Sequence, residues 1–525
     1  MPLEESSLSP AALLRQWLED SRRLHIPLLL GVALLMRMGV FFHLDTVMLG
    51  WREADMSSIA ANYLRNGFRF LYPQIDWGGG GPGYVEMEFP IIPFLTAVLF
   101  KIFGAHDICA LIIPFLSGLC VVIAVYFLGR RLIDSSIGFV AAIFVAVSPL
   151  LSLASQTFLG EPALLLCSIL SVYYLLGWVE NGRWSDYLFS MFFTTLAVLL
   201  KLTALYIGLP LLAIVANKYG RSLVRRRAFW SFGIFSLLPV FLWYCHAHNI
   251  YVEYGNTFGI LSGGYNKFAR VDLLMSPDFY SLIAKRVLLS VSTPVVFILF
   301  LFGLYQRPSR AVVYAMHWWA AALVIYTLLI AEGNKDMIYY QLPWLPVLSI
   351  FGTIGMFSFL DVMGKWSFVS SPARRLPALV AVLSIVIISL AGVIVRSSHV
   401  PITFLDYEAG VKGLAEEVKE VTPPGSLLVV ATSYGNEKTP STIDTPPQMF
   451  YFSGRHGWYL ALAWLTPAAV DSLKEEGADF LVVFGGDVKT FHENPSLFEQ
   501  LTSRFPPVVD RADLLVLGLH GKQRS

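Results

Sequence analysis

The sequence predicts a mainly α, polytopic membrane protein with about eleven transmembrane helices, interfacial helices in the first outer loop, and a small C-terminal α/β domain. Of its 525 residues, 56% are hydrophobic and only 14% are charged, against about 25% charged in ordinary soluble proteins. Apolar runs long enough to cross a hydrocarbon core of about 30 Å recur between residues 24 and 396. The formal net charge of +1 offers no basic surface for nucleic acid.

Eleven apolar runs of the order of 20 residues are the predicted spans, because a helix rises about 1.5 Å per residue. They are residues 24–44, 107–129, 136–155, 161–179, 186–200, 202–217, 228–247, 286–305, 311–331, 338–360 and 376–396. The first run is too long for a signal-peptide core and lacks a small-residue cleavage site, so we predict a retained anchor.

The run 89–104 is shorter, begins with Phe89-Pro90 and contains Pro93, which predicts an interfacial or re-entrant helix. If this helix does not cross, the basic loop clusters all fall on one side, which is therefore cytoplasmic. These clusters are Arg22-Arg23, Arg130-Arg131, Arg183, and residues 218–227, 307–310 and 365–375. The long loops 45–106 and 248–285 are then extracytoplasmic, and we expect the chemistry there.

Three regions follow: a cytoplasmic segment at 1–23, the transmembrane domain at 24–396, and an extracytoplasmic α/β domain at 397–525. The last region alternates strand-like runs, 426–431 and 479–484, with a helical stretch at 467–476. The sequence has no internal repeat and no matched pair of spans broken by Gly or Pro. This weakens the interpretation of the chain as an inverted-repeat transporter.

The first outer loop opens with a predicted amphipathic helix at 51–67 that carries Glu53 and Asp55 near its start. Carboxylates at a helix start are often simple caps, since they complement free N–H groups and the helix dipole. Beside an apolar surface, however, burial raises the pKa of a carboxyl toward the value that a general base needs. The local sequence leaves both interpretations open.

Further along this loop, four glycines at 78–81 are accompanied by aromatic residues and by Glu86 and Glu88. A flexible turn explains the glycines alone. The aromatic residues Tyr72, Trp77 and Tyr84 together with the acids also suit a sugar site, because rings pack on pyranose C–H surfaces and carboxylates accept hydroxyl hydrogen bonds. The glycine spacing does not match a phosphate-binding P-loop.

Glu161 lies at the outer entrance of a span, directly before Pro162. It can be a helix-start anion, but it must face the same compartment as Asp55 and Glu88, and three acids at one surface exceed what capping requires. Cations on that side are few: Lys201, Lys267, Arg270 and Lys335. Each can snorkel to lipid headgroups, or together they can hold the phosphate of a lipid carrier.

Arg37 lies within the first span and requires a partner or an aqueous cavity. His246 and His248, near the outer end of the 228–247 run, are either interfacial hydrogen bonders or, with Glu88, ligands of a divalent metal ion. The sequence contains no zincin-type spacing of histidines, which favours the first interpretation.

Taken in order, these features resemble the glycosyltransferase-C superfamily, in the branch of protein O-mannosyltransferases and bacterial aminoarabinose and related lipid-sugar transferases. The resemblance covers most of residues 24–400. It rests on Asp55 before an Ile/Ala/Tyr helix, Glu88-Phe89-Pro90 before a helix ending in Phe103-Gly104, the turn Gly129-Arg130-Arg131, Glu161, Lys201, and the late-span motif from Tyr340 to Pro343.

The resemblance implies inverting transfer of a monosaccharide from a polyprenyl-phosphate carrier, without a nucleotide-sugar donor, to a glycolipid, polysaccharide or protein acceptor. It implies catalytic roles for Asp55 as general base and for Glu161 and Glu88. Substrate binding is assigned to Glu53, Arg37, Lys201, Arg270, Lys335 and Tyr340. No cofactor is required, a divalent metal ion at Glu88, His246 and His248 being the alternative. The site would face the outside of a bacterial plasma membrane, among membrane lipids.

Two positions depart from the family pattern. Met56 follows Asp55 where many members have an adjacent Asp-Glu pair, and Phe89 follows Glu88 where the aminoarabinose branch tends to have Lys. Aminoarabinose is therefore not assigned as the substrate. Two other functional classes stay open at this point: a membrane carrier or lipid flippase for a glycolipid, and a scaffold whose tail binds a partner.

Overall fold

The computed structural model describes residues 9–38, 50–263, 267–306, 314–366, 372–397, 402–433 and 447–520. Internal contacts divide the chain into two compact units, and each is described by itself. Unit 1 comprises residues 1–42, 112–241 and 266–399. Unit 2 comprises residues 43–111, 242–265 and 400–525. The domain boundaries predicted at residues 23 and 396 stay predictions.

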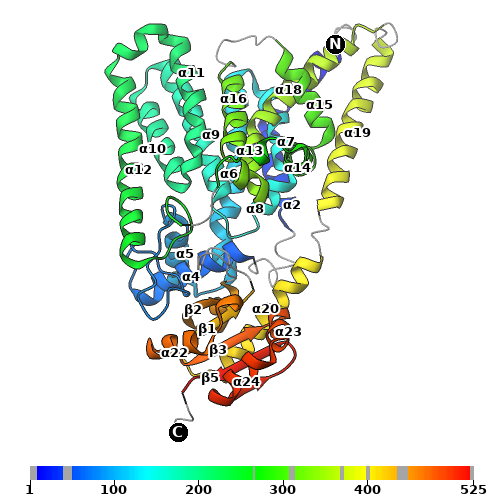
Figure 1. Cartoon of the computed structure of the whole chain (residues 1–525). Coiled ribbons are helices and arrows are strands. Elements are labelled where there is room, and N and C mark those ends of the chain that lie inside the picture. The colour runs from blue at the N-terminus through cyan, green and yellow to red at the C-terminus, as the bar shows by residue number, and fades with distance from the viewer. Residues whose placement is uncertain are drawn as a thin grey trace. The chain divides into compact units, whose positions relative to one another are not determined.

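Unit 1 is helical (Figure 1). Its helices are α1 (Pro10–Asp20), η2 (Arg22–Leu24), α2 (His25–Leu35), most of α6 (Asp107–Leu132), α7 (Ser135–Ala146), α8 (Pro149–Ala154), α9 (Glu161–Asn181), α10 (Trp184–Leu200), η4 (Leu202–Ile207), α11 (Gly208–Tyr219), η5 (Gly220–Arg225), the first part of α12 (Arg227–Tyr254), α13 (Val271–Leu274), α14 (Pro277–Arg286), η6 (Val287–Val291), α15 (Pro294–Tyr305), α16 (Tyr314–Leu329), α17 (Ala331–Asp336), η8 (Ile338–Trp344), α18 (Leu345–Met363) and α19 (Pro372–Ser397).

Small residues allow the helices of unit 1 to pack closely. A side chain at Gly303 of α15 would collide with the backbone of α18 at Phe351, and one at Gly355 of α18 would collide with Leu299 of α15. Membrane helices depend on such small residues for close backbone approach. Helices α9, α10 and α11 also lie side by side (Figure 1).

The number of spans is not confirmed as eleven. Within the described residues, the helical segments long and apolar enough to cross a membrane are Asp107–Leu132, Glu161–Asn181, Leu202–Arg225, Arg227–Tyr254 and Ile338–Met363. A sixth candidate, Pro277–Val291 with Pro294–Tyr305, is bent by 105°. Proline-led helix starts at Pro149 and Pro294 divide two runs predicted as continuous, since proline cannot donate the backbone hydrogen bond of a helix interior. The predicted spans 24–44 and 311–331 extend partly outside the described residues.

Unit 2 contains the loop predicted to be the first outer one, with helices α4 (Trp51–Asn66) and α5 (Ile91–Phe103). The amphipathic helix predicted at 51–67 is therefore confirmed, and Gly67, at a φ of 93°, ends it in the left-handed conformation typical of a glycine cap. Helix α5 has 13 residues, about 20 Å at 1.5 Å per residue, and is too short to cross about 30 Å of hydrocarbon.

The C-terminal part of unit 2 is an α/β fold, as predicted. Strands β1 (Leu427–Thr432), β2 (His456–Ala461), β3 (Phe480–Phe484), β4 (Pro507–Asp510) and β5 (Leu514–Gly518) form one sheet in the order β2-β1-β3-β5-β4. Strand β1 is parallel to β2 and β3, whereas β3, β5 and β4 pair antiparallel. The helices are α20 (Ile402–Val421), α21 (Gln448–Ser453), η10 (Leu462–Trp464), α22 (Pro467–Glu475), α23 (Gly486–His492) and α24 (Pro495–Arg504).

Candidate active site

Asp55 lies one turn into α4, and its side chain points into unit 2 rather than capping its own helix. The residue is 6% exposed, and its Oδ1 accepts a hydrogen bond of 3.0 Å from Nε1 of Trp77. Burial raises the pKa of Asp55 to about 7, and the neighbouring acids Asp76 and Glu53 add to the rise. The Trp77 hydrogen bond and the charge of Arg52 act in the opposite direction.

Glu53 is the third residue of α4, in the first turn after the N-cap Gly50. A Cβ at Gly50 would collide with the Glu53 carboxylate, so this side chain folds back over the helix start. In a capping box, the acid at the third helical position reaches back to the backbone N–H of the N-cap residue, and Glu53 occupies this position. The capping interpretation therefore fits Glu53 and not Asp55.

Glu88 is brought next to the start of α4 by an ion pair. Its Oε2 lies 2.8 Å from Nη2 of Arg52, and the guanidinium group also packs over the ring of Phe258, 4.8 Å from the centroid. The Glu88 side chain is 12% exposed. Arg52 thus pairs with Glu88 while its charge also acts on Asp55, a partner that the sequence analysis did not identify.

The glycine-rich loop is a packed structure and not an open sugar platform. Trp77 and Tyr84 are 4% and 8% exposed, so the ring stacking predicted for them is not supported, whereas Tyr72 is 38% exposed. Glu86 is fully buried and accepts hydrogen bonds from the hydroxyl groups of Thr257 and Ser262. These contacts give Glu86 a structural role in unit 2.

A second cluster lies in unit 1, where α9 begins. The Glu161 carboxylate pairs with the Lys201 ammonium at 2.8 Å. The same ammonium lies over two rings, 4.0 Å from the centroid of Tyr340 and 4.8 Å from that of Tyr339. Three predicted residues, Glu161, Lys201 and Tyr340, are therefore in contact.

Two further predicted cations of unit 1, Arg270 and Lys335, have acidic partners of their own. Arg270 pairs with Asp272 at 2.5 Å and with Glu332 at 3.8 Å, and Lys335 pairs with the same Glu332 carboxylate oxygen at 3.1 Å. The backbone carbonyl oxygen of Lys267 accepts a hydrogen bond from the Gly333 amide. Arg270 and Lys335 thus lie around one acid, Glu332.

Arg37 is fully buried in the described part of the chain. Its Nη1 donates to the carbonyl oxygen of Ala33 at 2.9 Å and to that of Ala146 at 3.4 Å. Its Nε and Nη2 have no hydrogen-bond acceptor among the described residues. The role in substrate binding assigned to Arg37 stays a prediction.

The two histidines of the metal alternative make ordinary hydrogen bonds. Nε2 of His246 lies 2.9 Å from the carbonyl oxygen of Leu71, and Nδ1 of His248 lies 2.8 Å from Oγ of Ser262. No group of three or more His, Cys, Asp or Glu side chains suited to a metal ion occurs among the described residues. These contacts fit the interfacial hydrogen bonding predicted as the first interpretation.

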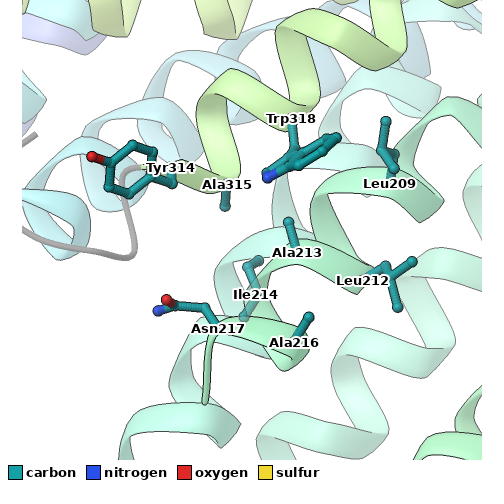
Figure 2. Close-up of a pocket in the computed structure, with 9 residues that line it drawn as sticks. All are labelled: Leu209, Leu212, Ala213, Ile214, Ala216, Asn217, Tyr314, Ala315 and Trp318. Carbon is teal, nitrogen blue, oxygen red and sulfur yellow. The ribbon is translucent and has the colours of Figure 1, made fainter. Parts of the chain in front are cut away.

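A cavity of about 400 Å³ lies between α11 and α16 (Figure 2). It is lined by Leu209, Leu212, Ala213, Ile214, Ala216, Asn217, Tyr314, Ala315 and Trp318. None of the predicted site residues lines it. The cavity is therefore separate from both acid clusters.

A known protein family matches part of the sequence, and solved structures share the fold of the chain. Residues 88–244 match the family model described as dolichyl-phosphate-mannose-protein mannosyltransferase, a range that includes Glu88, Glu161 and Lys201. No curated protein sequence matches the chain. The solved structure of ArnT from Cupriavidus metallidurans bound to undecaprenyl phosphate is similar over 95% of this chain and 99% of that chain, at 15% identity and a TM-score of 0.59. Its apo state gives 14% identity and a TM-score of 0.62 over the same shares.

The archaeal oligosaccharyltransferase AglB from Archaeoglobus fulgidus, in complex with an inhibitory peptide and a dolichol-phosphate, is similar over 89% of this chain and 70% of that chain. The identity is 11% and the TM-score 0.58. The chain has the glycosyltransferase-C fold. The predicted resemblance is confirmed at this level, and the protein is a multi-pass membrane protein.

Two of the three acids predicted to be catalytic, Glu88 and Glu161, lie within the range that matches the family model. Asp55 precedes the matched range 88–244, so its importance rests on its own geometry. Arg52, Asp76 and Trp77 were not predicted as its neighbours. Of these three neighbours, only Arg52 lies close to Asp55 in the sequence, three positions before it on the same helix.

We expect Asp55→Asn to raise the melting temperature, with a gain that grows between pH 5 and pH 8. The folded protein holds the Asp55 proton up to about pH 7, whereas the unfolded chain releases it near pH 3.8. The stability from protonated Asp55 is thus fully present below pH 3.8 and is lost as the pH rises toward 7, a loss of the order of 4 kcal/mol. Asparagine avoids this loss. Thermal unfolding of both proteins at the two pH values measures it, and an equal difference at pH 5 and pH 8 would contradict the raised pKa.

Proposed function

We propose that the chain is an inverting glycosyltransferase that moves a monosaccharide from a polyprenyl-phosphate carrier to a glycolipid, polysaccharide or protein acceptor. The reaction takes place at the outer face of a bacterial plasma membrane, with the C-terminal domain on the same side. The observation that carries this proposal is the buried Asp55 carboxyl, whose pKa of about 7 suits a base at neutral pH.

In the proposed reaction, Asp55 takes the proton from the acceptor group. The acceptor atom attacks the anomeric carbon of the donor sugar, and the bond from that carbon to the phosphate oxygen breaks. The lipid phosphate leaves with the bonding electron pair, so a single displacement inverts the anomeric configuration. Arg52, held between Glu88 and the Phe258 ring, keeps a positive charge near Asp55 and favours its ionised form.

The second cluster supplies charge for the donor. Within unit 1, Glu161 and Tyr340 hold the Lys201 ammonium group, and a fixed cation of this kind can steady a leaving phosphate. In this account the reaction needs no cofactor, because fixed cations stabilise the negative charge. Turnover unaffected by a chelator would agree with this, and turnover lost on chelation and restored by a divalent ion would favour the metal alternative.

The comparisons support the donor class. ArnT was solved with undecaprenyl phosphate, and AglB with a dolichol-phosphate and an inhibitory peptide, so chains of this fold accommodate a polyprenyl phosphate and, in one case, a peptide. Glycolipid, polysaccharide and protein acceptors all remain within the proposal.

The test uses the full chain reconstituted in liposomes, with a panel of radiolabelled polyprenyl-phosphate sugars and cell-envelope acceptors. A labelled covalent product from one donor, absent from empty liposomes, is the expected result, and its anomeric configuration should be opposite to that of the donor. Movement of labelled lipid across the bilayer without any covalent product would overturn the proposal in favour of a carrier.

A further inference from the structure

Trp77 of the loop 71–90 contacts both Asp55 and the C-terminal domain. Trp77 donates its Nε1 hydrogen to Asp55, and its ring contacts two other rings. Phe258 is edge-on at a centroid distance of 5.9 Å, and Tyr459 of strand β2 is tilted by 44° at 6.4 Å. All four residues belong to unit 2. Trp77 therefore links strand β2 to the proposed base.

The loop that carries Trp77 is tied to the start of β2 on both sides of it. The Asp76 carboxylate pairs with Nδ1 of His456 at 3.0 Å, and the Asp76 carbonyl oxygen accepts from the Gly457 amide at 3.0 Å. The Gly79 amide in turn donates to the Gly457 carbonyl oxygen at 2.7 Å. A side chain at Gly79 would lie 2.7 Å from Nε1 of Trp458, so the two segments pack without a gap.

The same loop is tied to α4. The Asn62 amide donates to the Asp76 carboxylate at 2.8 Å and to the Gln74 carbonyl oxygen at 3.1 Å. Burial alone would raise the pKa of Asp76, but hydrogen bonding and charge from His456, with Arg65 and Asn62, outweigh it and hold this pKa below its usual value. An ionised Asp76 thus joins α4, the loop and β2.

We propose that Tyr459 is a positioning residue, which holds Trp77 against Asp55 and makes the C-terminal domain part of the catalytic site. This inference rests on the proposed function, in which Asp55 is the base. The electrostatics agree with the geometry, since loss of water around the Tyr459 hydroxyl and the charges of Asp55 and Asp76 raise the pKa of Tyr459. A domain that only covered the membrane part would not need this contact.

The test compares three full-length variants in sugar transfer. Tyr459→Leu removes the ring and is expected to lower kcat about tenfold with KM within about twofold, the size expected when a hydrogen bond to a charged group is misplaced. Tyr459→Phe keeps the ring and should restore kcat to within about twofold of the wild type. Phe498→Leu is the matched control, because it removes a ring from the same domain that packs on Phe491 and His492, whereas Trp77 packs on Phe258 and Tyr459.

A double-mutant cycle tests whether Tyr459 acts through Trp77. Trp77→Phe removes the hydrogen bond to Asp55 and should lower kcat about tenfold by itself. If Tyr459 acts through Trp77, the double variant Tyr459→Leu, Trp77→Phe is no slower than the slower single variant. Losses that multiply, or a Phe498→Leu loss equal to that of Tyr459→Leu, would overturn the inference.

Hydrogen exchange separates failure of the inference from failure of the proposed function, because it needs no turnover. In Tyr459→Leu, amides of the loop 71–90 should exchange at least about tenfold faster than in wild type, while α22 and α24 keep their protection. If the wild type transfers no sugar from any donor, the proposed function fails, and this exchange result alone decides whether Tyr459 holds the loop. Unchanged loop exchange would overturn the inference in either case.

Discussion

Asp55→Asn is expected to lower sugar-transfer turnover about 10²–10⁴-fold, the range found when a general base is removed. Asparagine has nearly the same shape and can still accept the Trp77 hydrogen bond, so the buried arrangement around residue 55 is kept. What it cannot do is take a proton from the acceptor. We therefore expect the loss in kcat, with KM for the lipid donor changing little. Initial rates with the donor identified in the panel measure both.

The matched control for this variant is Asp471→Asn, the same substitution at an acid of the C-terminal domain. Asp471 forms a surface ion pair with Arg504 at 2.7 Å, and its side chain is 35% exposed. Surface pairs contribute little, so turnover should stay within about twofold of wild type. If Asp55→Asn is as active as Asp471→Asn, Asp55 is not the base.

Lys201→Met is expected to lower kcat/KM for the lipid donor about 10²-fold. Methionine keeps the unbranched stem but removes the positive charge that we propose steadies the leaving phosphate. It also leaves the Glu161 carboxylate, which is 13% exposed, without its ammonium partner at 2.8 Å. Steady-state kinetics with varied donor concentration, and the melting temperature of the same sample, separate loss of chemistry from loss of fold.

Lys218→Met controls for removal of a lysine from the same span. Lys218 and Lys201 lie near opposite ends of the segment that contains η4 and α11, and Lys218 also lies near a ring, 5.6 Å from the centroid of Tyr219. The predicted topology puts Lys218 on the cytoplasmic side, away from the proposed chemistry. Equal kcat/KM in the two variants would remove Lys201 from the donor site.

The fold could be predicted from the sequence as far as local patterns determine it. Apolar runs predict the helices, and the stripe ending at Gly67 predicts α4 to within one residue. The breaks at Pro149 and Pro294 were missed, because a proline in an apolar run can either kink a helix or start a new one. Strands β2, β4 and β5 were also missed, since these short segments depend on pairing with distant strands.

The candidate site could be predicted only in part. Asp55 was predicted because a carboxyl beside an apolar surface can serve as a base and because the family resemblance implies that role, whereas its hydrogen-bond partner Trp77 comes from another segment. Trp77 was predicted to stack on sugar, but the structure uses its N–H as a donor to Asp55. The Asp76–His456 pair joins the first outer loop to the C-terminal domain, a contact that no local pattern can predict.

The most direct test of the central claim is the pH dependence of kcat/KM for sugar transfer by the wild type between pH 5 and pH 9. Asp55 must be ionised to accept a proton, and burial raises its pKa to about 7, so kcat/KM should rise with pH and level off above an inflection near 7. The residual rate of Asp55→Asn should lack that inflection. A wild-type profile that is flat across this range, or that falls as the pH rises through 7, would contradict the assignment of Asp55 as the general base.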